Sequence, residues 1–300
     1  MPLHNRGETI ERALASLSAQ TFRDFEVVIV DCGSTDDTRT RVADFFQSST
    51  FKTFPFPYKF ETRDYVPVGV EDWNEPVRLA RGTYIAMLEG DDYFLPEHLT
   101  QAHAALSRAE HIGVYATGNQ RRKRKLSGLI PAAGHLRAIY LMDEVPPPSE
   151  TIFIRCDRKN NPFLYNDRDY GYAPEIDLYI RIALAGFDAY YAASQDVVRR
   201  VTTGKSTTEW KYFADHFRIA QMYRDTPGLL PGDARAARLY AQKHAYYQYV
   251  RECHSNGRNC MELRKRLVEM DGYMFYARYL QTAIERAVIK TKMKIRALYV

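Results

Sequence analysis

The sequence predicts an α/β protein whose mainly parallel β-sheet is flanked by helices, with a helical extension behind it. Two observations support this fold class. Short apolar runs alternate with helical patterns as far as about residue 206, and two of these runs lead directly into acidic loops. Alternating strands and helices favour a parallel sheet covered on both faces, which binds ligands at the carboxyl ends of its strands. The pattern beyond is helical, so we expect domains at residues 1–206 and 207–300.

The first elements are predicted as helix, strand, loop and helix. Residues 5–8 have capping-box spacing, which predicts a helix that continues to about residue 20. Residues 25–30 are continuously apolar, as in a strand buried on both sides. Ser34 and Asp37 repeat the capping-box spacing before another helix, and Gly33 between strand and helix suits a turn.

The middle of the chain is predicted from periodicity and from proline positions. Aromatic residues and prolines make residues 51–70 an irregular segment. Residues 71–81 have a helical pattern, and Pro76 must lie in the first turn or break the helix. Apolar runs predict further strands at residues 83–88, 112–117, 151–154 and 197–198. Further helices are expected after Pro96, at residues 177–185 and from residue 210 onward.

Composition and charge narrow the class of protein. The hydrophobic share of 45% and the charged share of 26% are ordinary for a globular chain. No apolar run approaches the roughly 18 residues that span a bilayer, and no signal peptide is recognisable. We therefore expect a cytoplasmic protein with reduced cysteines. The net charge of +5 comes from the tail, since residues 251–300 carry +6 and the first 250 carry −1.

An acidic loop after the strand at residues 83–88 is the strongest local candidate for a site. Glu89, Asp91 and Asp92 place three carboxylates within four residues, and such a cluster needs a positive charge nearby. Oxygen ligands of this kind suit Mg²⁺ or Mn²⁺, often shared with a substrate phosphate. A polar strand-to-helix loop is the alternative, and this stretch alone leaves both open. For the positive run at residues 121–125, a solvated loop is favoured over an anion-binding function.

Four motifs in this order resemble family 2 glycosyltransferases, which have the GT-A fold. Residues 5–38 are similar to the opening of that family, and residues 89–92 lie where it keeps an acidic metal-binding motif. The lead-in at residues 72–82 is also similar. Residues 173–181 resemble the acidic motif that precedes an apolar helix with an arginine. The resemblance covers about residues 1–206, and the helical tail shares no motif with the family.

The resemblance implies a metal-dependent, inverting transfer of a sugar from a nucleoside-diphosphate donor, expected to be a UDP-sugar. The acceptor would be a hydroxyl of a saccharide or lipid-linked molecule in cell-surface glycan synthesis. A Mn²⁺ or Mg²⁺ ion on Asp92 would stabilise the departing diphosphate, with Asp91 at the ribose and Glu89 in support of either role. A carboxylate must accept the acceptor's proton. Glu175 has the family's position for this base; Asp177 is the alternative, although it also suits a helix N-terminus.

The nucleotide end of the site is also implied by the resemblance. His4 and Asn5 match the residues that flank the base, and Asp31 ends the second strand. Cys32 replaces a second acid that normally helps to hold the nucleobase. Glu175 replaces the commoner aspartate, and residues 200–202 lack the histidine often found in the closing loop.

One expectation about the start of the chain and one alternative function follow from these departures. Only residues 1–4 represent the first strand, so we expect the natural chain to begin upstream of Met1. Together with Cys32 and Glu175, this shortened strand favours the alternative of a sugar-nucleotide-binding protein of the same fold that has lost turnover.

The basic tail suggests a partner surface. Residues 273–300 combine apolar and basic side chains in a helical pattern. We expect peripheral contact with an anionic membrane at its inner face, the alternative being that this helix packs on the catalytic domain. Nucleic acid is not an expected partner, because the tail's aromatic residues fall within the helical pattern.

Overall fold

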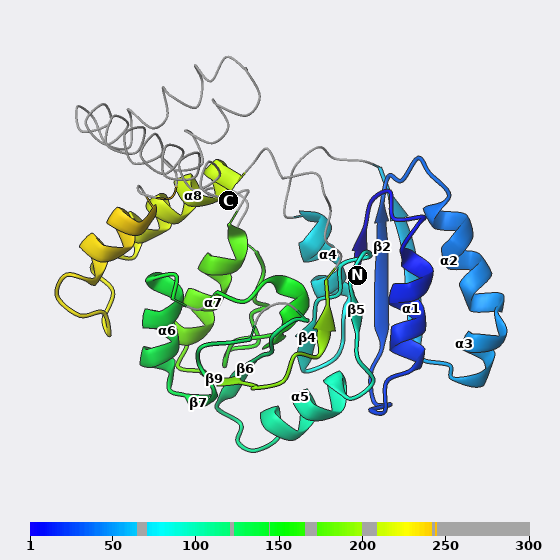
Figure 1. The fold of residues 1–300 in the computed structure, drawn as a ribbon, viewed down its shortest axis with the longest axis horizontal. Helices are drawn as coiled ribbons and strands as arrows, with labels where there is room; N and C mark the ends of the chain where they lie inside the picture. Colours follow the sequence, from blue (N-terminus) through cyan, green and yellow to red (C-terminus); the bar gives the residue numbers. More distant parts are fainter. Residues whose placement is uncertain are drawn as a thin grey trace, which may run out of the picture. The chain divides into compact units, whose positions relative to one another are not determined.

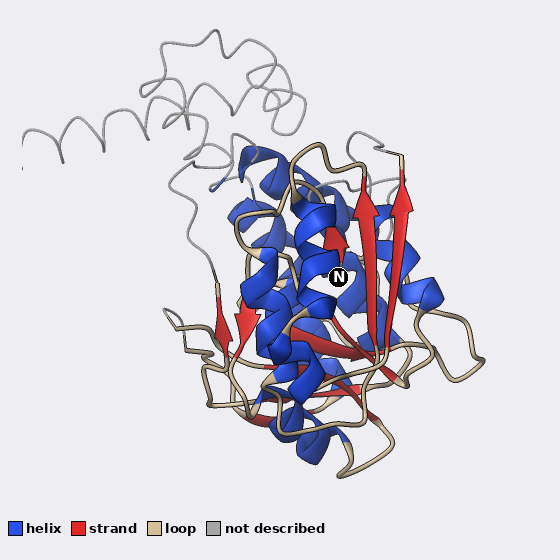
Figure 2. Cartoon of the chain, turned by 90° about the vertical axis from the view of Figure 1, so that its right-hand side faces the viewer, coloured by secondary structure: helices blue, strands red, loops and turns tan. Residues whose placement is uncertain are grey.

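The computed structural model describes residues 1–64, 71–120, 123–143, 145–165, 173–199, 209–241 and 244. The chain divides into two compact units, Met1–Thr203 and Gly204–Val300 (Figure 1). In the first unit, strands form a three-stranded, a five-stranded and a two-stranded sheet. The strands lie in differently oriented groups with helices packed beside them (Figure 2).

The three-stranded sheet is parallel and holds the N-terminal elements together. Its order is β1 (Pro2–Leu3), β2 (Val27–Cys32) and β3 (Tyr58–Arg63), and every residue of β2 is buried. Val27 and Ile29 belong to the core cluster that includes the apolar face of helix α1 (Ile10–Ser18). Val28 and Val30 lie on the opposite face of the strand, against Leu79 of helix α4 (Glu71–Leu79). Helices on both faces explain the continuous apolar residues 27–30 of β2.

The five-stranded sheet is mixed. Its order is β4 (Tyr84–Ala86), β8 (Thr151–Ile154), β6 (Ile112–Ala116), β9 (Asp188–Tyr191) and β7 (Gly128–Ile130), and only β6 and β9 pair in parallel. The accompanying helices are α5 (His98–Leu106), α6 (Ala132–Tyr140) and α7 (Pro174–Leu184), with a 3₁₀ turn at Pro148–Glu150. β5 (Tyr93–Phe94) and β10 (Val197–Val198) form the antiparallel two-stranded sheet. Parallel pairing therefore characterises the first sheet and one pair of the second.

The prediction of an irregular segment at residues 51–70 is wrong for most of its described part. Helix α2 (Thr38–Gln47) is followed by the short helix α3 (Ser49–Thr53), and β3 then pairs with β2 along its full length. The aromatic residues form a cluster, in which Phe46 stacks on Tyr58 with ring centroids 3.6 Å apart and Phe51 packs edge-on against Phe56. Packing of these rings onto the sheet outweighs the local proline signal.

Pro76 and the two capping boxes were also predicted incorrectly. Pro76 lies well inside α4, beyond its first turn, and the helix continues to Leu79 because Val77 and Leu79 pack into the interior. The first helix begins only at Ile10. Asn5 does not cap it but adopts a left-handed conformation with φ of 50°, and Ser34 accepts a hydrogen bond from the Asn5 backbone. These polar residues join two loops instead of capping the helices that follow them.

The second unit is helical where it is described. Helix α8 (Glu209–Met222) is followed by a turn and by helical residues 233–241. Within the described residues, none of the helices is long and apolar enough to cross a membrane. The basic tail at residues 251–300, on which the predicted membrane contact depends, lies outside the described residues.

Candidate donor site

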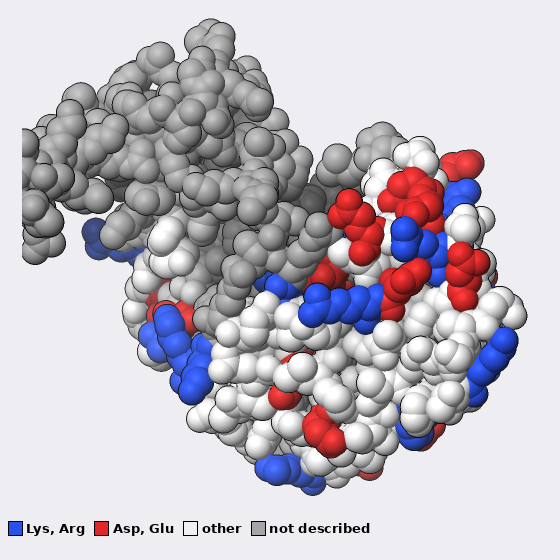
Figure 3. Space-filling view, turned by 45° about the vertical axis from the view of Figure 1, so that its right-hand side comes forward, with Lys and Arg blue, Asp and Glu red and all other residues white. Residues whose placement is uncertain are grey.

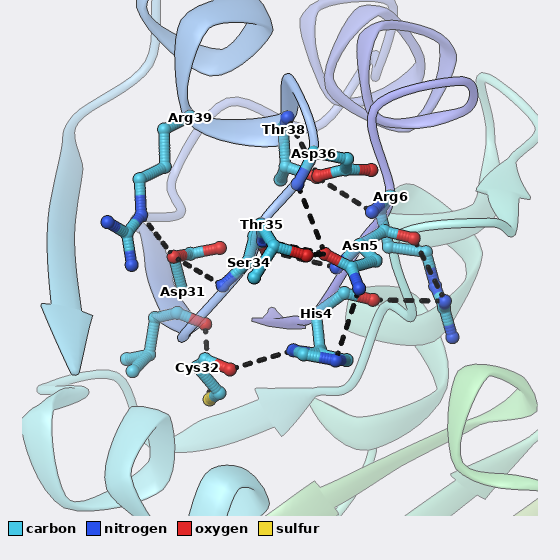
Figure 4. Close-up of polar contacts among 11 residues, drawn as sticks. His4, Asn5, Arg6, Asp31, Cys32, Ser34, Thr35, Asp36, Thr38 and Arg39 are labelled. Atoms are coloured by element: carbon cyan, nitrogen blue, oxygen red, sulfur yellow. Dashed lines mark hydrogen bonds and ion pairs between the residues drawn. The ribbon is translucent and has the colours of Figure 1, made fainter. Parts of the chain in front are cut away.

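Two loops at the carboxyl ends of β1 and β2 are joined by a set of short hydrogen bonds (Figure 4). The Asn5 backbone N–H donates to Ser34 Oγ at 2.9 Å, and Asn5 Oδ1 accepts from the Thr35 N–H at 2.8 Å. The Gly7 N–H donates to Asp36 Oδ2 at 3.0 Å. A Cβ at Gly7 would lie 1.8 Å from Asp37 Oδ1, so a larger residue there would have to displace the Asp37 side chain. The four predicted nucleotide-binding positions 4, 5, 31 and 32 are therefore brought into one rigid junction.

His4 is oriented by two contacts within this junction. Its Nδ1 lies 2.9 Å from the carbonyl oxygen of Cys32, which requires Nδ1 to be the protonated nitrogen. Its Nε2 lies 3.3 Å from Asn5 Nδ2, so Asn5 donates to it. His4 thereby links the end of β1 to the end of β2.

Asp31 is fully buried and only half satisfied. Its Oδ2 accepts from Arg39 Nε at 2.5 Å and from the Ser34 N–H at 3.2 Å. Its Oδ1 is buried and has no hydrogen-bond partner. Leaving a buried acceptor unsatisfied costs about 1–3 kcal/mol, so this oxygen is suited to accept an N–H from a bound ligand.

Cys32 has a neighbouring carboxylate that the sequence reasoning did not identify. Its thiol is hydrogen-bonded to Asp72, in the first turn of α4. Burial and the charge of Asp72 raise the pKa of Cys32 to about 12, so the thiol stays protonated. The structure thus places an acid from α4 beside the position where the family has its second acid. The only sequence signal for it was the similarity of the lead-in at residues 72–82.

The acidic loop follows β4 and packs against the first strand. The Asp92 N–H donates to the Glu89 carbonyl at 3.0 Å and forms a tight turn. A Cβ at Gly90 would lie 2.6 Å from Leu3 Cδ2, so glycine allows this close approach to β1. Glu89 is partly buried beside Ser149, and its desolvation, followed by the charge of Asp92, raises its pKa to about 7.

Arginines compensate the two aspartates of this loop. Asp91 Oδ1 lies 3.7 Å from Arg6 Nε, and Asp92 Oδ2 lies 3.5 Å from Arg199 Nε. Figure 3 shows acidic and basic side chains gathered next to one another in the upper right part of the described surface. Among the described residues, no group of three or more His, Cys, Asp or Glu side chains is arranged to hold a metal ion. The predicted ligands Glu89, Asp91 and Asp92 are neighbours in the loop but do not form such a cluster.

The positive run at residues 121–125 does not behave as a solvated loop throughout. Arg124 is buried and forms an ion pair with Glu150, whose side chain is also fully buried. Glu150 Oε1 accepts from Asn119 Nδ2 at 2.7 Å, and Arg124 Nε donates to the Thr117 carbonyl at 2.7 Å. The prediction is therefore wrong for Arg124, because a local run of charges does not reveal a distant partner. Residues 121 and 122 lie outside the described residues.

The two candidate bases lie in the first turn of α7 and differ in their surroundings. Asp177 is buried, and its Oδ2 accepts from Arg181 Nε at 2.7 Å, one helical turn farther on. Arg181 also donates to the Leu164 carbonyl. Glu175 is only partly buried. Asp177 therefore holds Arg181 and the segment before residue 165 in place, which leaves Glu175 as the more accessible carboxylate.

Tyr165 connects the acidic loop to α7 and was not predicted. Asn74 holds its backbone, with bonds of 2.7 Å to the Tyr165 N–H and 2.9 Å to the carbonyl. Its hydroxyl is buried without a hydrogen-bond partner. Burial raises the pKa of Tyr165 well above its usual value, and the charges of Glu175 and Glu89 add to this rise.

Comparison with known proteins supports the resemblance for the first part of the chain. Residues 1–128 match the family model described as glycosyl transferase family 2. The resemblance to family 2 glycosyltransferases is confirmed. The region of similarity includes both donor-site loops, at residues 4–7 and 31–38, and the acidic loop at residues 89–92.

Curated relatives in Escherichia coli match about a third of the chain. The enzyme named UDP-Glc:alpha-D-GlcNAc-diphosphoundecaprenol beta-1,3-glucosyltransferase WfgD is 29% identical over 99 residues, which are 33% of this chain and 36% of the relative. Chondroitin synthase is 33% identical over 97 residues, which are 32% of this chain and 13% of the relative. The chain thus spans about a third or less of the length of these relatives.

Solved structures show the fold. Staphylococcus aureus TarS 1–349 aligns with a TM-score of 0.62 at 16% identity and covers 94% of this chain and 87% of that one. The mannosyltransferase PcManGT from Pyrobaculum calidifontis was solved with GDP-Man and Mn²⁺. It aligns with a TM-score of 0.60 at 18% identity, over 96% of this chain and 84% of PcManGT. The predicted GT-A fold is confirmed.

The buried pair of Arg124 and Glu150 yields a stability prediction. Glu150→Gln leaves the buried Arg124 charge uncompensated, so the free energy of unfolding should fall by about 3–5 kcal/mol in urea denaturation. Glu11→Gln is the control: it breaks an exposed ion pair, 3.4 Å long, with Arg41, and should leave the urea midpoint unchanged. Equal midpoints for the Glu150 variant and wild type would contradict the assigned role of this pair.

Proposed function

We propose that this chain transfers a sugar from a UDP-sugar to a hydroxyl of a saccharide or lipid-linked acceptor, with inversion, in cell-surface glycan synthesis. The buried, unpartnered Asp31 Oδ1 in the junction of the β1 and β2 loops is the observation that carries the proposal. Uracil presents an N–H suited to this oxygen. Two relatives support the donor class: the E. coli glucosyltransferase is named for UDP-Glc, and S. aureus TarS was solved with UDP-GlcNAc.

A divalent cation, Mn²⁺ or Mg²⁺, fits the acidic loop as a group shared with the donor. Asp91 and Asp92 offer carboxylate oxygens on consecutive residues, which suit a hard cation that takes its other ligands from a diphosphate and water. Glu89 is the third candidate, beside Ser149. When bound, such an ion acts as a Lewis acid on the departing diphosphate. PcManGT, of the same fold, was solved with Mn²⁺.

Glu175 is the proposed general base. An inverting transfer needs a carboxylate that accepts the proton of the attacking hydroxyl on the side opposite the diphosphate. Glu175 has the required exposure, whereas the Asp177 carboxylate is engaged with Arg181 at 2.7 Å.

Asp92→Asn tests the acidic loop and the function together. Wild-type protein should hydrolyse a UDP-sugar slowly with Mn²⁺ and no acceptor, since water can replace the acceptor hydroxyl. Asp92→Asn should abolish this turnover with an unchanged circular dichroism spectrum, and Asp91→Asn should be nearly as severe. Hydrolysis is measured by release of UDP. Wild-type-like turnover of Asp92→Asn would overturn the assignment, and UDP binding without turnover in wild type would favour the non-catalytic sugar-nucleotide-binding alternative.

Glu175→Gln tests the base. It should lower the transfer rate by about 10²–10⁴-fold while UDP affinity, measured by calorimetry, stays near that of wild type. Asp177→Asn is the matched comparison and should mainly lower the melting temperature, because it releases Arg181. The choice between the two acids is reversed if Asp177→Asn loses turnover at an unchanged melting temperature and Glu175→Gln keeps it.

Residues 251–300 are proposed to bring the protein to the inner face of an anionic membrane from the cytoplasm. Each basic residue near such a surface contributes on the order of 1 kcal/mol, screened by salt. In co-sedimentation, full-length protein should pellet with vesicles that contain anionic lipid and not with neutral vesicles at low salt. Deletion of residues 284–300 should abolish pelleting. Equal partitioning of both proteins would leave this segment without a membrane role.

A further inference from the structure

Arg199 is placed directly across from the acidic loop by strand pairing. In the antiparallel pair of β10 and β5, Val198 pairs with Tyr93. Arg199, the residue that follows β10, therefore lies opposite Asp92. The Arg199 Nε to Asp92 Oδ2 distance of 3.5 Å agrees with this register. Position 199 is thus determined by the sheet and not by a side-chain contact alone.

Gln120 holds the backbone of Arg199 on both sides. Its side-chain Nε2 donates to the Arg199 carbonyl at 2.7 Å, and its Oε1 accepts from the Arg199 N–H at 2.9 Å. The Gln120 backbone N–H in turn donates to the Val197 carbonyl at 3.2 Å. A residue held in this way is preorganised, which lowers the entropic cost of using its side chain to bind a ligand.

The guanidinium of Arg199 has hydrogen-bonding capacity to spare. It lies 3.5 Å from Asp92 and 3.8 Å from Glu150, which is beyond ordinary hydrogen-bond distance in both cases. Its Nε is buried and has no hydrogen-bond partner among the described residues, while the side chain as a whole is 39% exposed. Arg6, the other arginine that lies near the acidic loop, instead donates hydrogen bonds to the carbonyls of His4 and Asn5.

The second carboxylate near Arg199, that of Glu150, is already neutralised by another arginine. Glu150 is fully buried, and its charge is matched by the equally buried Arg124. Glu150 Oε1, the carboxylate oxygen nearest to Arg199, accepts a hydrogen bond from Asn119 Nδ2 at 2.7 Å. Among the described residues, Asp92, the proposed metal ligand, is therefore the carboxylate that Arg199 faces on the side of the acidic loop.

We propose that Arg199 binds the diphosphate of the donor and stabilises the negative charge that develops on it during transfer. This inference rests on the proposed use of a nucleoside-diphosphate sugar. A guanidinium offers planar, paired N–H donors that match phosphate oxygens, and a preorganised donor in a partly buried site stabilises developing charge effectively. Arg199 would take up a phosphate oxygen with the donors that Asp92 and Glu150 leave unsatisfied.

Calorimetry with UDP and with uridine isolates this role, because the two ligands differ only in the diphosphate. Arg199→Gln should weaken UDP binding by about tenfold, in Mn²⁺ and in EDTA, and leave uridine binding unchanged. Arg199→Lys should restore part of the loss, since it keeps the charge without the planar fork. Arg41→Gln is the matched control: Arg41 is exposed to a similar extent, 42%, and also pairs with two acids, Asp37 and Glu11.

Each outcome supports or overturns the proposal. A lower melting temperature of Arg199→Gln with an unchanged ratio of UDP to uridine affinity would assign Arg199 a structural role only. Equal loss of UDP and uridine affinity would show a collapsed site and would also contradict the proposal. If wild type binds UDP and Arg199→Gln binds it equally well, this inference fails while the proposed function stands. If wild type binds none of UDP, GDP or ADP, both fail.

Discussion

Compensation of carboxylates by arginines from distant parts of the chain is the constraint on which this site depends. Acidic residues gather at the carboxyl ends of β2 and β4 and at the start of α7, where each would repel the next. Four of these acids, and Glu150 before β8, are each paired with an arginine: the pairs are Asp31 with Arg39, Asp91 with Arg6, Asp92 with Arg199, Glu150 with Arg124 and Asp177 with Arg181. The N-terminal loop, the acidic loop and β10 are thereby tied to the same region of the fold.

These pairs differ in length and exposure, and the difference distinguishes structural pairs from those in the proposed diphosphate site. Arg124 and Arg181 are paired with buried acids and also donate to main-chain carbonyls, so they fix the positions of Glu150 and Asp177. The pairs at Asp91 and Asp92 are longer, at 3.7 and 3.5 Å, and more exposed on the arginine side. Weak, partly solvated pairs exchange partners at little cost. The acidic loop is therefore the part of the network where an incoming diphosphate and cation can replace existing contacts.

Elements with local signals were predictable from the sequence. The apolar run of β2, the strands at residues 112–117 and 151–154 and the apolar helix α7 follow from periodicity alone, and the motifs led to Asp31, the acidic loop and Glu175. The rest depends on contacts between residues far apart in the chain. β3 is stabilised by pairing with β2 and by aromatic packing, which outweigh the prolines before it. Arg124 was predicted to be solvated because its partner Glu150 is remote in sequence. Nothing in the sequence pointed to Arg199, because its position beside Asp92 results from the pairing of β10 with β5.

A crystal structure of the protein with UDP and Mn²⁺ tests the donor-site assignment most directly. We expect the uracil N–H within hydrogen-bond distance of Asp31 Oδ1, the diphosphate in contact with the guanidinium of Arg199, and Mn²⁺ on Asp92. The nucleotide should leave the hydrogen bonds between the loops of Asn5 and Ser34 unchanged, since this junction already has the required shape. A nucleotide bound elsewhere, or bound in this junction with its base away from Asp31, would contradict the assignment.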